Sequence, residues 1–482
     1  MTQSNISMSF ATQSNRLVLN NNNQTEFENF WHNNELNYVV NKDTKIISYA
    51  YQVSNVDPLA CLQKLNQKDT LHFYWENCSK QEAVAAWGVT RSSYTKPNSR
   101  FNSAQNFVQS CFDRIVREGE SNLAIGKPSV FCSFSFFAEA RDAEPFKSGT
   151  LFLPRFGIVK KNKNCCFIVN YPLQDRQDEK QIIEQIEQKL DSINWKQLKH
   201  IKIDEDNLLS SIDRERDRDS DYFKSVVGSA LEAIAVGELS KVVIAHTTEI
   251  RSKQPFKLID SLNNLRQLHP DCYIFSTSNG KGQHFVGASP ERLISVQNRQ
   301  LVTDALAGSA PRGTNNTEDL HLANLLLKNR KEKREHQAVS DFMMQRLREI
   351  GLKPQQLPLQ LLKLSNIQHL WTPIYAHLPA NIEPLEIVAL LHPTPAVAGV
   401  STEIACKKIR QYEKFDRSLY AAPLGWIDYE GNGEFVVGIR SALIDGDRAR
   451  LYAGAGIVSG SNPDREFDEV QLKLQSLLKA LV

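Results

Sequence analysis

The sequence predicts an α/β fold of the α+β type, with large antiparallel β-sheets at the centre and helices covering them. Segments rich in aromatic and β-branched residues alternate with loops, as is typical of strands. Other segments carry the 3.6-residue apolar repeat of amphipathic helices. In the last 80 residues, turns of three or four residues separate successive strand-like segments. Parallel strands need a longer crossover, so these turns favour antiparallel pairing over a doubly wound parallel sheet.

The first half of the chain is expected to be mainly strands followed by one helix. The predicted helix spans residues 177–193, where Ile182, Ile183, Ile186 and Leu190 share one face. The predicted strands are residues 71–77, 83–89, 129–137, 150–162 and 165–171.

The second half is expected to begin with an amphipathic helix from Tyr222 to near Gly237, followed by a strand at 241–250. Residues 272–296 read as two strands joined by the Asn-Gly-Lys-Gly turn at 279–282. A helix is expected over 321–350. The buried face of the first helix is predicted to be Phe223, Val226, Val227, Ala230, Ile234 and Ala235.

The last segment is predicted to be three strands and a helix. The strands are residues 419–429, 434–444 and 448–457, with turns at 430–433 and 445–447, and the helix starts at about Pro463. For the whole chain we expect a tail at 1–25, an N-terminal lobe at 26–205 and a catalytic core at 206–482, the two lobes forming one fold unit. The polar stretch 202–221 is the expected linker.

The composition describes an ordinary soluble globular protein, with 41% hydrophobic and 23% charged residues. A net charge of +2 gives no reason to expect nucleic acid or a membrane as a partner. The eight cysteines include no CxxC pair and no metal-ligand spacing, which fits a reducing, cytoplasmic location.

Two pairs of glutamates share the spacing i, i+3, which places both carboxylates of a pair on one helix face. They are Glu332 with Glu335, and Glu466 with Glu469. Two such helices facing each other would form an oxygen-only site suited to Mg²⁺. The alternative is a solvated helix surface, as the neighbouring sequence KNRKEKREH also suggests.

Lys241 and Glu291 are the candidate base and acid. A lysine acts as a base only where its surroundings depress its pKa, and Lys241 opens a strand directly after a helix. A carboxyl in an apolar setting stays protonated and can donate, and Glu291 follows Ser289-Pro290 in GASPERL. The alternatives are a strand-end lysine and a turn carboxylate on the surface.

Small residues at strand ends in GASPERL, ALAGSAPRG and LYAGAGI could let backbone N–H groups approach an anion. None of these segments matches a nucleotide-binding loop. Arg440, at the end of a strand, could grip a carboxylate bidentately. Lys473 lies four residues after Glu469, on the same helix face.

Together these segments resemble the chorismate-utilising enzymes, a family that includes anthranilate synthase component I, isochorismate synthase and salicylate synthase. The resemblance covers about residues 222–482, in family order. It rests on KVVIAH, GASPERL, ALAGSAPRG, KREH, HPTPAVAG, GIR, AGAGI and REFDEV. It implies the chorismate-binding fold of anthranilate synthase component I and Mg²⁺-assisted attack on C2 of chorismate with loss of the C4 hydroxyl.

Variable positions favour one branch of this family, the isochorismate synthases. Members that use water carry a lysine where Lys241 stands, and ammonia users do not, so no glutaminase subunit is expected. Ala307 stands where aminodeoxychorismate synthases carry lysine, and Ala396 stands where salicylate synthases usually carry threonine. The first half of the chain, with FYWE, resembles isochorismate synthases of the menaquinone and phylloquinone pathways.

The resemblance also implies roles for individual residues. Lys241 is the general base and Glu291 the general acid. Mg²⁺ is held by Glu335 and Glu469, supported by Glu332 and Glu466. The substrate is bound by Ala396, Tyr420, Arg440, Lys473 and the backbone at Gly308, Ser309, Gly454 and Ala455. Two alternatives stay open: a salicylate synthase, which also eliminates pyruvate, and a catalytically silent chorismate-binding relative.

Overall fold

The structure is a computed structural model. It describes residues 43–66, 69–120, 125–140, 144–174, 177–201, 212–214, 220–365 and 367–481. Residues 40–482 form one compact unit. The expected tail and most of the expected linker lie outside the described residues. Nowhere in the described ranges is there a helix with the length and apolar character needed to cross a bilayer.

The larger of two sheets has 13 strands and draws them from both halves of the chain. Its neighbours are antiparallel except for the parallel pair β1 and β5. β12 from the second half pairs with β2 from the first half, so one sheet runs through both. In spatial order the strands are β10 (Ile212–Arg214), β11 (Lys241–Ser252), β23 (Arg448–Val458), β22 (Ser441–Asp445), β13 (Gln283–Ser289), β12 (Tyr273–Ser278), β2 (His72–Asn77), β3 (Glu82–Trp87), β8 (Phe156–Lys161), β9 (Asn164–Pro172), β1 (Ile46–Val53) and β5 (Ile115–Gly119), and β19 (Gly399–Val400) also pairs with β11.

The second sheet has 10 strands and is antiparallel throughout. It too joins the two halves, because β20 pairs with β6. Its order is β16 (Gln355–Gln356), β18 (Ile367–His377), β15 (Gln300–Pro311), β14 (Arg292–Gln297), β21 (Gly433–Val437), β20 (Pro423–Asp428), β6 (Ser129–Phe134), β7 (Gly149–Leu153) and β4 (Arg91–Tyr94), and β17 (Gln360–Lys363) pairs with β18.

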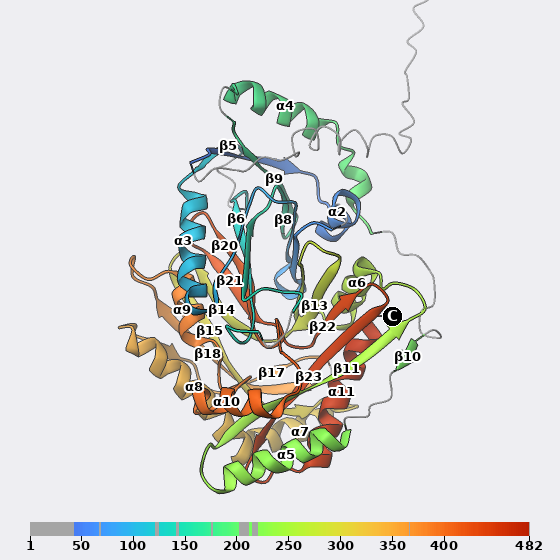
Figure 1. Cartoon of the computed structure of the whole chain (residues 1–482), viewed down its shortest axis with the longest axis vertical. Coiled ribbons are helices and arrows are strands. Elements are labelled where there is room, and N and C mark those ends of the chain that lie inside the picture. Colours follow the sequence, from blue (N-terminus) through green and yellow to red (C-terminus); the bar gives the residue numbers. More distant parts are fainter. Residues whose placement is uncertain are drawn as a thin grey trace, which may run out of the picture. The chain divides into compact units, whose positions relative to one another are not determined.

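The two sheets contact each other through aromatic side chains, and helices cover them. The ring of Phe73 on β2 lies 4.9 Å from that of Phe131 on β6. In Figure 1, α11 and α5 lie beside the paired strands β11 and β23, while α8 lies over β15 and β18. The helices are α2 (Pro58–Leu65), α3 (Arg100–Phe112), α4 (Glu179–Asp191), α5 (Ser220–Ala235), α6 (Leu258–Leu268), α7 (Asn316–Lys328), α8 (Arg330–Glu349), α9 (Pro384–Leu391), α10 (Thr402–Tyr412) and α11 (Pro463–Leu481).

The predicted fold class is confirmed, and so are the short turns between β12 and β13, β20 and β21, and β22 and β23. Three predicted strands are each divided between the two sheets. Residues 150–162 form β7 and β8, residues 272–296 form three strands with β14 in the second sheet, and residues 434–444 form β21 and β22. The apolar pattern continues through each crossing because both sides of it are buried, so sequence alone hides the break.

Two helix predictions also need correction. The single helix expected over 321–350 is two helices, because Asn329 adopts an extended conformation and its side chain caps the next helix. Asn favours such N-cap positions. Ala235, expected in the buried face of the helix from Tyr222, is exposed at the last residue of α5, and Ala233 is buried instead.

The connections between sheets place two of the predicted site residues. Glu291 lies between β13 of the first sheet and β14 of the second, and Arg440 lies between β22 and β21. The Val437 amide donates to the Glu291 carbonyl at 3.0 Å, and the Ala288 amide donates to the Arg440 carbonyl at 3.1 Å. These hydrogen bonds tie the two crossings together where the sheets meet.

Candidate active site

Lys241 begins β11, and its side chain is only 3% exposed. The strand pairs with β23 on one side and with the short β19 on the other, so its position is fixed from both edges. Lys241 Nζ lies 2.6 Å from Glu335 Oε1, and the Glu335 side chain is 13% exposed. The structure therefore joins the predicted base and a predicted metal ligand in one ion pair.

Gly456 provides the space in which this ion pair lies. It is opposite Val243 in the β11–β23 register, on the sheet face shared by Lys241 because side chains alternate along a strand. A Cβ at Gly456 would stand 3.1 Å from both Glu335 Oε1 and Lys241 Cε. The methyl group of an alanine at position 456 would therefore crowd both side chains of the ion pair.

Glu291 is 4% exposed. Burial raises its pKa to about 8; the Lys241 cation partly opposes this rise, and Asp304 adds to it. Asp304 accepts hydrogen bonds from Arg292 and from the Trp371 indole N–H, each at 2.9 Å. Glu291 is accordingly protonated at neutral pH, the state that a general acid requires.

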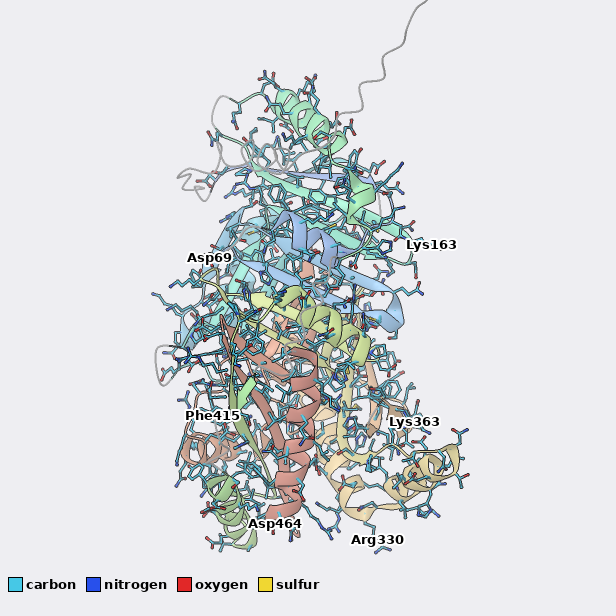
Figure 2. All side chains as sticks on the ribbon, turned by 90° about the vertical axis from the view of Figure 1, so that its right-hand side faces the viewer. Asp69, Lys163, Arg330, Lys363, Phe415 and Asp464 are labelled. Carbon is cyan, nitrogen blue, oxygen red and sulfur yellow. The ribbon has the colours of Figure 1, made fainter. Side chains whose placement is uncertain are left out.

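The two predicted carboxylate pairs lie at the starts of α8 and α11. Figure 2 shows both helix starts at the lower end of the view, labelled by Arg330 and Asp464. Burial, and then the neighbouring Glu335 charge, raise the pKa of Glu332. Burial also raises the pKa of Glu466, with Glu469 contributing. Glu469 on α11 also raises the pKa of Glu332 on α8, so the carboxylates of the two helices act on one another.

Glu469 is held by a lysine, as Glu335 is. Lys473 Nζ lies 2.8 Å from Glu469 Oε1 and donates to the Gly454 carbonyl at 2.8 Å. Burial opposes ionisation of Glu469, but Lys473 and then Lys331 more than offset it, so its pKa is lowered. In the described part of the chain, no three Asp, Glu, His or Cys side chains are gathered as a metal-ligand group.

The donor set still fits Mg²⁺. This ion takes one or two carboxylates and completes its coordination with water and substrate, so three assembled protein ligands are not required. Oxygen is the only donor type that these four glutamates offer. Two ammonium groups, Lys241 and Lys473, occupy positions against Glu335 and Glu469 where a cation would lie.

Gly308 and Ser309 lie against Glu332 at a bulge in β15. Gly308 has φ +77°, and a Cβ there would stand 3.0 Å from Glu332 Oε2. The Ser309 backbone lowers the pKa of Glu332 and so partly offsets the effect of burial. The predicted anion-binding backbone therefore lies against this glutamate.

Arg440 has φ +49° and extends toward β18. Its Nη2 lies 3.4 Å from Nε2 of His369, and its Nη1 donates to Cys272 Sγ at 3.8 Å. Burial, and then the Arg440 and Lys473 cations, lower the pKa of His369 to about 3. His369 is a neutral site residue that the sequence did not reveal, because it is a single histidine without a spacing partner.

Tyr420 and β23 form another wall of the site. The Tyr420 ring stacks on Tyr452 at 5.2 Å, and a Cβ on Gly454 would stand 2.9 Å from the Tyr420 hydroxyl oxygen. Burial raises the pKa of Tyr420, so the phenol stays protonated. Ala455 is buried and pairs with Ile244 in the β-ladder.

The turn that contains Ala396 lies beside β11. The Val397 and Ala398 amides donate to the Thr394 carbonyl at 3.1 and 3.0 Å, and the Val243 amide donates to the Ala398 carbonyl at 2.9 Å. The Thr394 hydroxyl is buried and has no hydrogen-bond partner among the described residues. It is a second buried polar group, in the turn beside β11, that sequence reasoning missed.

A fully buried ion pair fixes this turn to the strand. Arg417 is 0% exposed and donates to the carbonyls of Val397 and Val243, each at 2.8 Å. It also lies 2.6 Å from Glu413, whose carboxylate accepts the Ala245 amide at 2.8 Å. Sequence reasoning missed this ion pair and its contacts, because they depend on the Val243 carbonyl, which lies 174 residues from Arg417 in the chain.

Comparison with known proteins decides the family. The family described as chorismate binding enzyme matches residues 34–482. The chain belongs to this family. The resemblance seen in its motifs is thereby confirmed, and the match extends well beyond residues 222–482.

Individual relatives of this chorismate-binding enzyme are similar along nearly their whole length. The isochorismate synthase MenF of Bacillus subtilis (strain 168) is 32% identical over 93% of this chain and 94% of its own. A Pseudomonas aeruginosa protein named salicylate biosynthesis isochorismate synthase is 30% identical over 90% of each chain. The solved menaquinone-specific isochorismate synthase MenF of Escherichia coli superposes with a TM-score of 0.75 at 26% identity, covering 95% of this chain and 99% of that one.

Proposed function

We propose that this protein is an isochorismate synthase, which converts chorismate to isochorismate reversibly by adding water at C2 and releasing the C4 hydroxyl. The observation that carries the proposal is the presence of both Lys241 and Glu291, the candidate base and the candidate acid, in one site. Both are buried in the same site, and the lysine cation acts on the carboxyl. Relatives that match over at least 90% of this chain are named isochorismate synthases, which supports the same activity.

In the proposed reaction, Lys241 accepts a proton from the water that attacks C2. Glu291 gives its proton to the departing C4 hydroxyl, which leaves as water while the ring double bond shifts. The lysine then carries one proton more and the glutamate one proton fewer, and transfer of a proton from the ammonium group to the carboxylate resets the site. One hydroxyl enters and one leaves, so the reaction needs no oxidant, reductant or second substrate.

The other groups bind substrate and metal in this proposal. Arg440 and Tyr420 bind the enolpyruvyl carboxylate, and Lys473 with the backbone near Gly308 and Gly454 binds carboxylate oxygens. Glu335 and Glu469 hold Mg²⁺, with Glu332 and Glu466 supporting them. When bound, the ion supplies positive charge that stabilises the substrate carboxylate and the departing oxygen.

The direct test is incubation of the purified protein with chorismate and Mg²⁺, followed by chromatography of the products. We expect isochorismate and chorismate in equilibrium. Salicylate without an added lyase would instead identify a salicylate synthase, and no turnover would indicate a silent chorismate-binding protein. The small side chain of Ala396 is the feature that favours release of isochorismate over further elimination of pyruvate.

Two variants test the assigned roles. Lys241→Ala should lower chorismate hydration about 10²–10⁴-fold, since this is the usual contribution of a general base. Near-normal turnover would contradict the base assignment. Glu469→Gln should raise the Mg²⁺ concentration needed for half-maximal activity, and an unchanged metal dependence would mean that the carboxylate pairs are surface charges.

A further inference from the structure

Each of the two carboxylates assigned to the metal is already paired with an ammonium group. Lys241 holds Glu335 at 2.6 Å, and Lys473 holds Glu469 at 2.8 Å. The two pairs come from different elements: the first joins β11 to α8, and the second lies within α11. Both metal carboxylates are thus neutralised by the same two lysines that the proposed reaction needs elsewhere.

These pairings conflict with the roles proposed for their members. A carboxylate oxygen held by an ammonium group is not free to coordinate a cation, and the ammonium group that holds it is not free to face the substrate. While either pair persists, neither of its members is available for the proposed task.

We propose that the divalent cation and the two lysines exchange places. Binding of the cation to Glu335 and Glu469 displaces Lys241 and Lys473 from these carboxylates, and this displacement leaves both lysine side chains available to the substrate. The inference rests on the proposed function for the identity of the metal carboxylates. It adds that loading of the metal and release of the two lysines are one event.

The surroundings allow this exchange. Lys241 acts electrostatically on Glu291 as well as pairing with Glu335, so a second carboxyl group lies near it when the cation takes Glu335. Lys473 keeps its hydrogen bond to the Gly454 carbonyl at 2.8 Å when Glu469 is taken by the cation. Both displaced ammonium groups therefore remain at the site.

Lys331 provides a matched control. It acts electrostatically on Glu332, Glu466 and Glu469, yet no ion pair within 4 Å joins it to a carboxylate among those that the structure shows. Its removal takes away one positive charge near the carboxylates without breaking a pair. The exchange therefore predicts different effects for Lys331 and for the two paired lysines.

The test is calorimetric titration of Mg²⁺ into the full chain without substrate. Lys241→Met and Lys473→Met should each bind Mg²⁺ about tenfold more tightly than the unmodified protein, because the cation no longer has to break an ion pair. Lys331→Met should change the affinity by less than about threefold. Lys241→Arg should bind like the unmodified protein, because the guanidinium restores the pair. Thermal unfolding of each variant checks that it is folded.

Equal tightening in Lys331→Met and Lys241→Met would overturn the exchange, because general charge repulsion would then account for both. Unchanged affinity in Lys241→Met and Lys473→Met would overturn it as well. If the protein forms isochorismate and binds Mg²⁺ but shows either result, only the exchange fails. If no variant binds Mg²⁺ at all, the metal assignment in the proposed function fails with it.

Discussion

Replacement of Glu291 by glutamine should change how the stability of the protein depends on pH. The carboxyl has a pKa of about 8 in the folded protein, whereas an unfolded glutamate has the model value 4.5. Below pH 4.5 both states carry the proton and the group has no effect. Between pH 4.5 and 8 the unfolded chain loses the proton that the folded protein keeps, so the free energy of unfolding falls as pH rises.

The size of this effect follows from the two pKa values. Each tenfold difference in proton affinity is worth about 1.4 kcal/mol. Above pH 8, Glu291 therefore lowers the free energy of unfolding by about 5 kcal/mol. Glutamine has a similar shape and never ionises. Glu291→Gln should therefore be little different from the unmodified protein at pH 5 and clearly more stable than it at pH 9.

Urea denaturation at pH 5, 7 and 9 measures this difference. Glu232→Gln, a change of an exposed glutamate on α5, serves as the control and should follow the unmodified protein at all three values. Parallel curves for Glu291→Gln and the unmodified protein would refute the reasoning, because they would mean that Glu291 ionises normally in the folded state. The same protonation predicts that turnover falls as pH rises through about 8, as the acid is lost.

Two further substitutions test the surroundings of the base. Gly456→Ala should lower kcat about tenfold or more, with little change in Tm, because the new Cβ would stand 3.1 Å from both Lys241 Cε and Glu335 Oε1; normal kcat would mean that the ion pair can shift freely. Arg417→Met should lower the free energy of unfolding by about 3–5 kcal/mol, since it removes the guanidinium that forms an ion pair with the buried Glu413 carboxylate. Chemical denaturation measures this loss, and a change below about 1 kcal/mol would show that this ion pair contributes little.

The parts of the fold that could be predicted from sequence are those set by local rules. The turns predicted at 430–433 and 445–447 follow from Gly and Asp in positions that demand tight reversal, and the structure has them at 429–432 and 446–447. The passage of the chain between sheets near Arg440 is not local. It depends on which strands lie alongside, and the apolar pattern is the same on either side of the crossing.

The candidate site likewise contains residues that sequence could reveal and residues that it could not. Lys241, Glu291 and the four glutamates occur in motifs, and the structure brings them into one region. His369 and Arg417 stand alone in the sequence, and their importance comes only from partners that the fold supplies. The ion pairing of Lys241 with Glu335 was also out of reach, because it joins the first residue of a strand to a helix that begins 89 residues later.

The position of β23 bears on how the protein is made. This strand lies between β11 and β22 in the sheet, although the chain reaches it only after every other strand has been synthesised (Figure 1). During translation, β11 therefore emerges from the ribosome long before its main partner. An unpaired strand edge is a template for association with other chains. β11, which carries the proposed base, therefore keeps one edge unpaired until β23 has been synthesised.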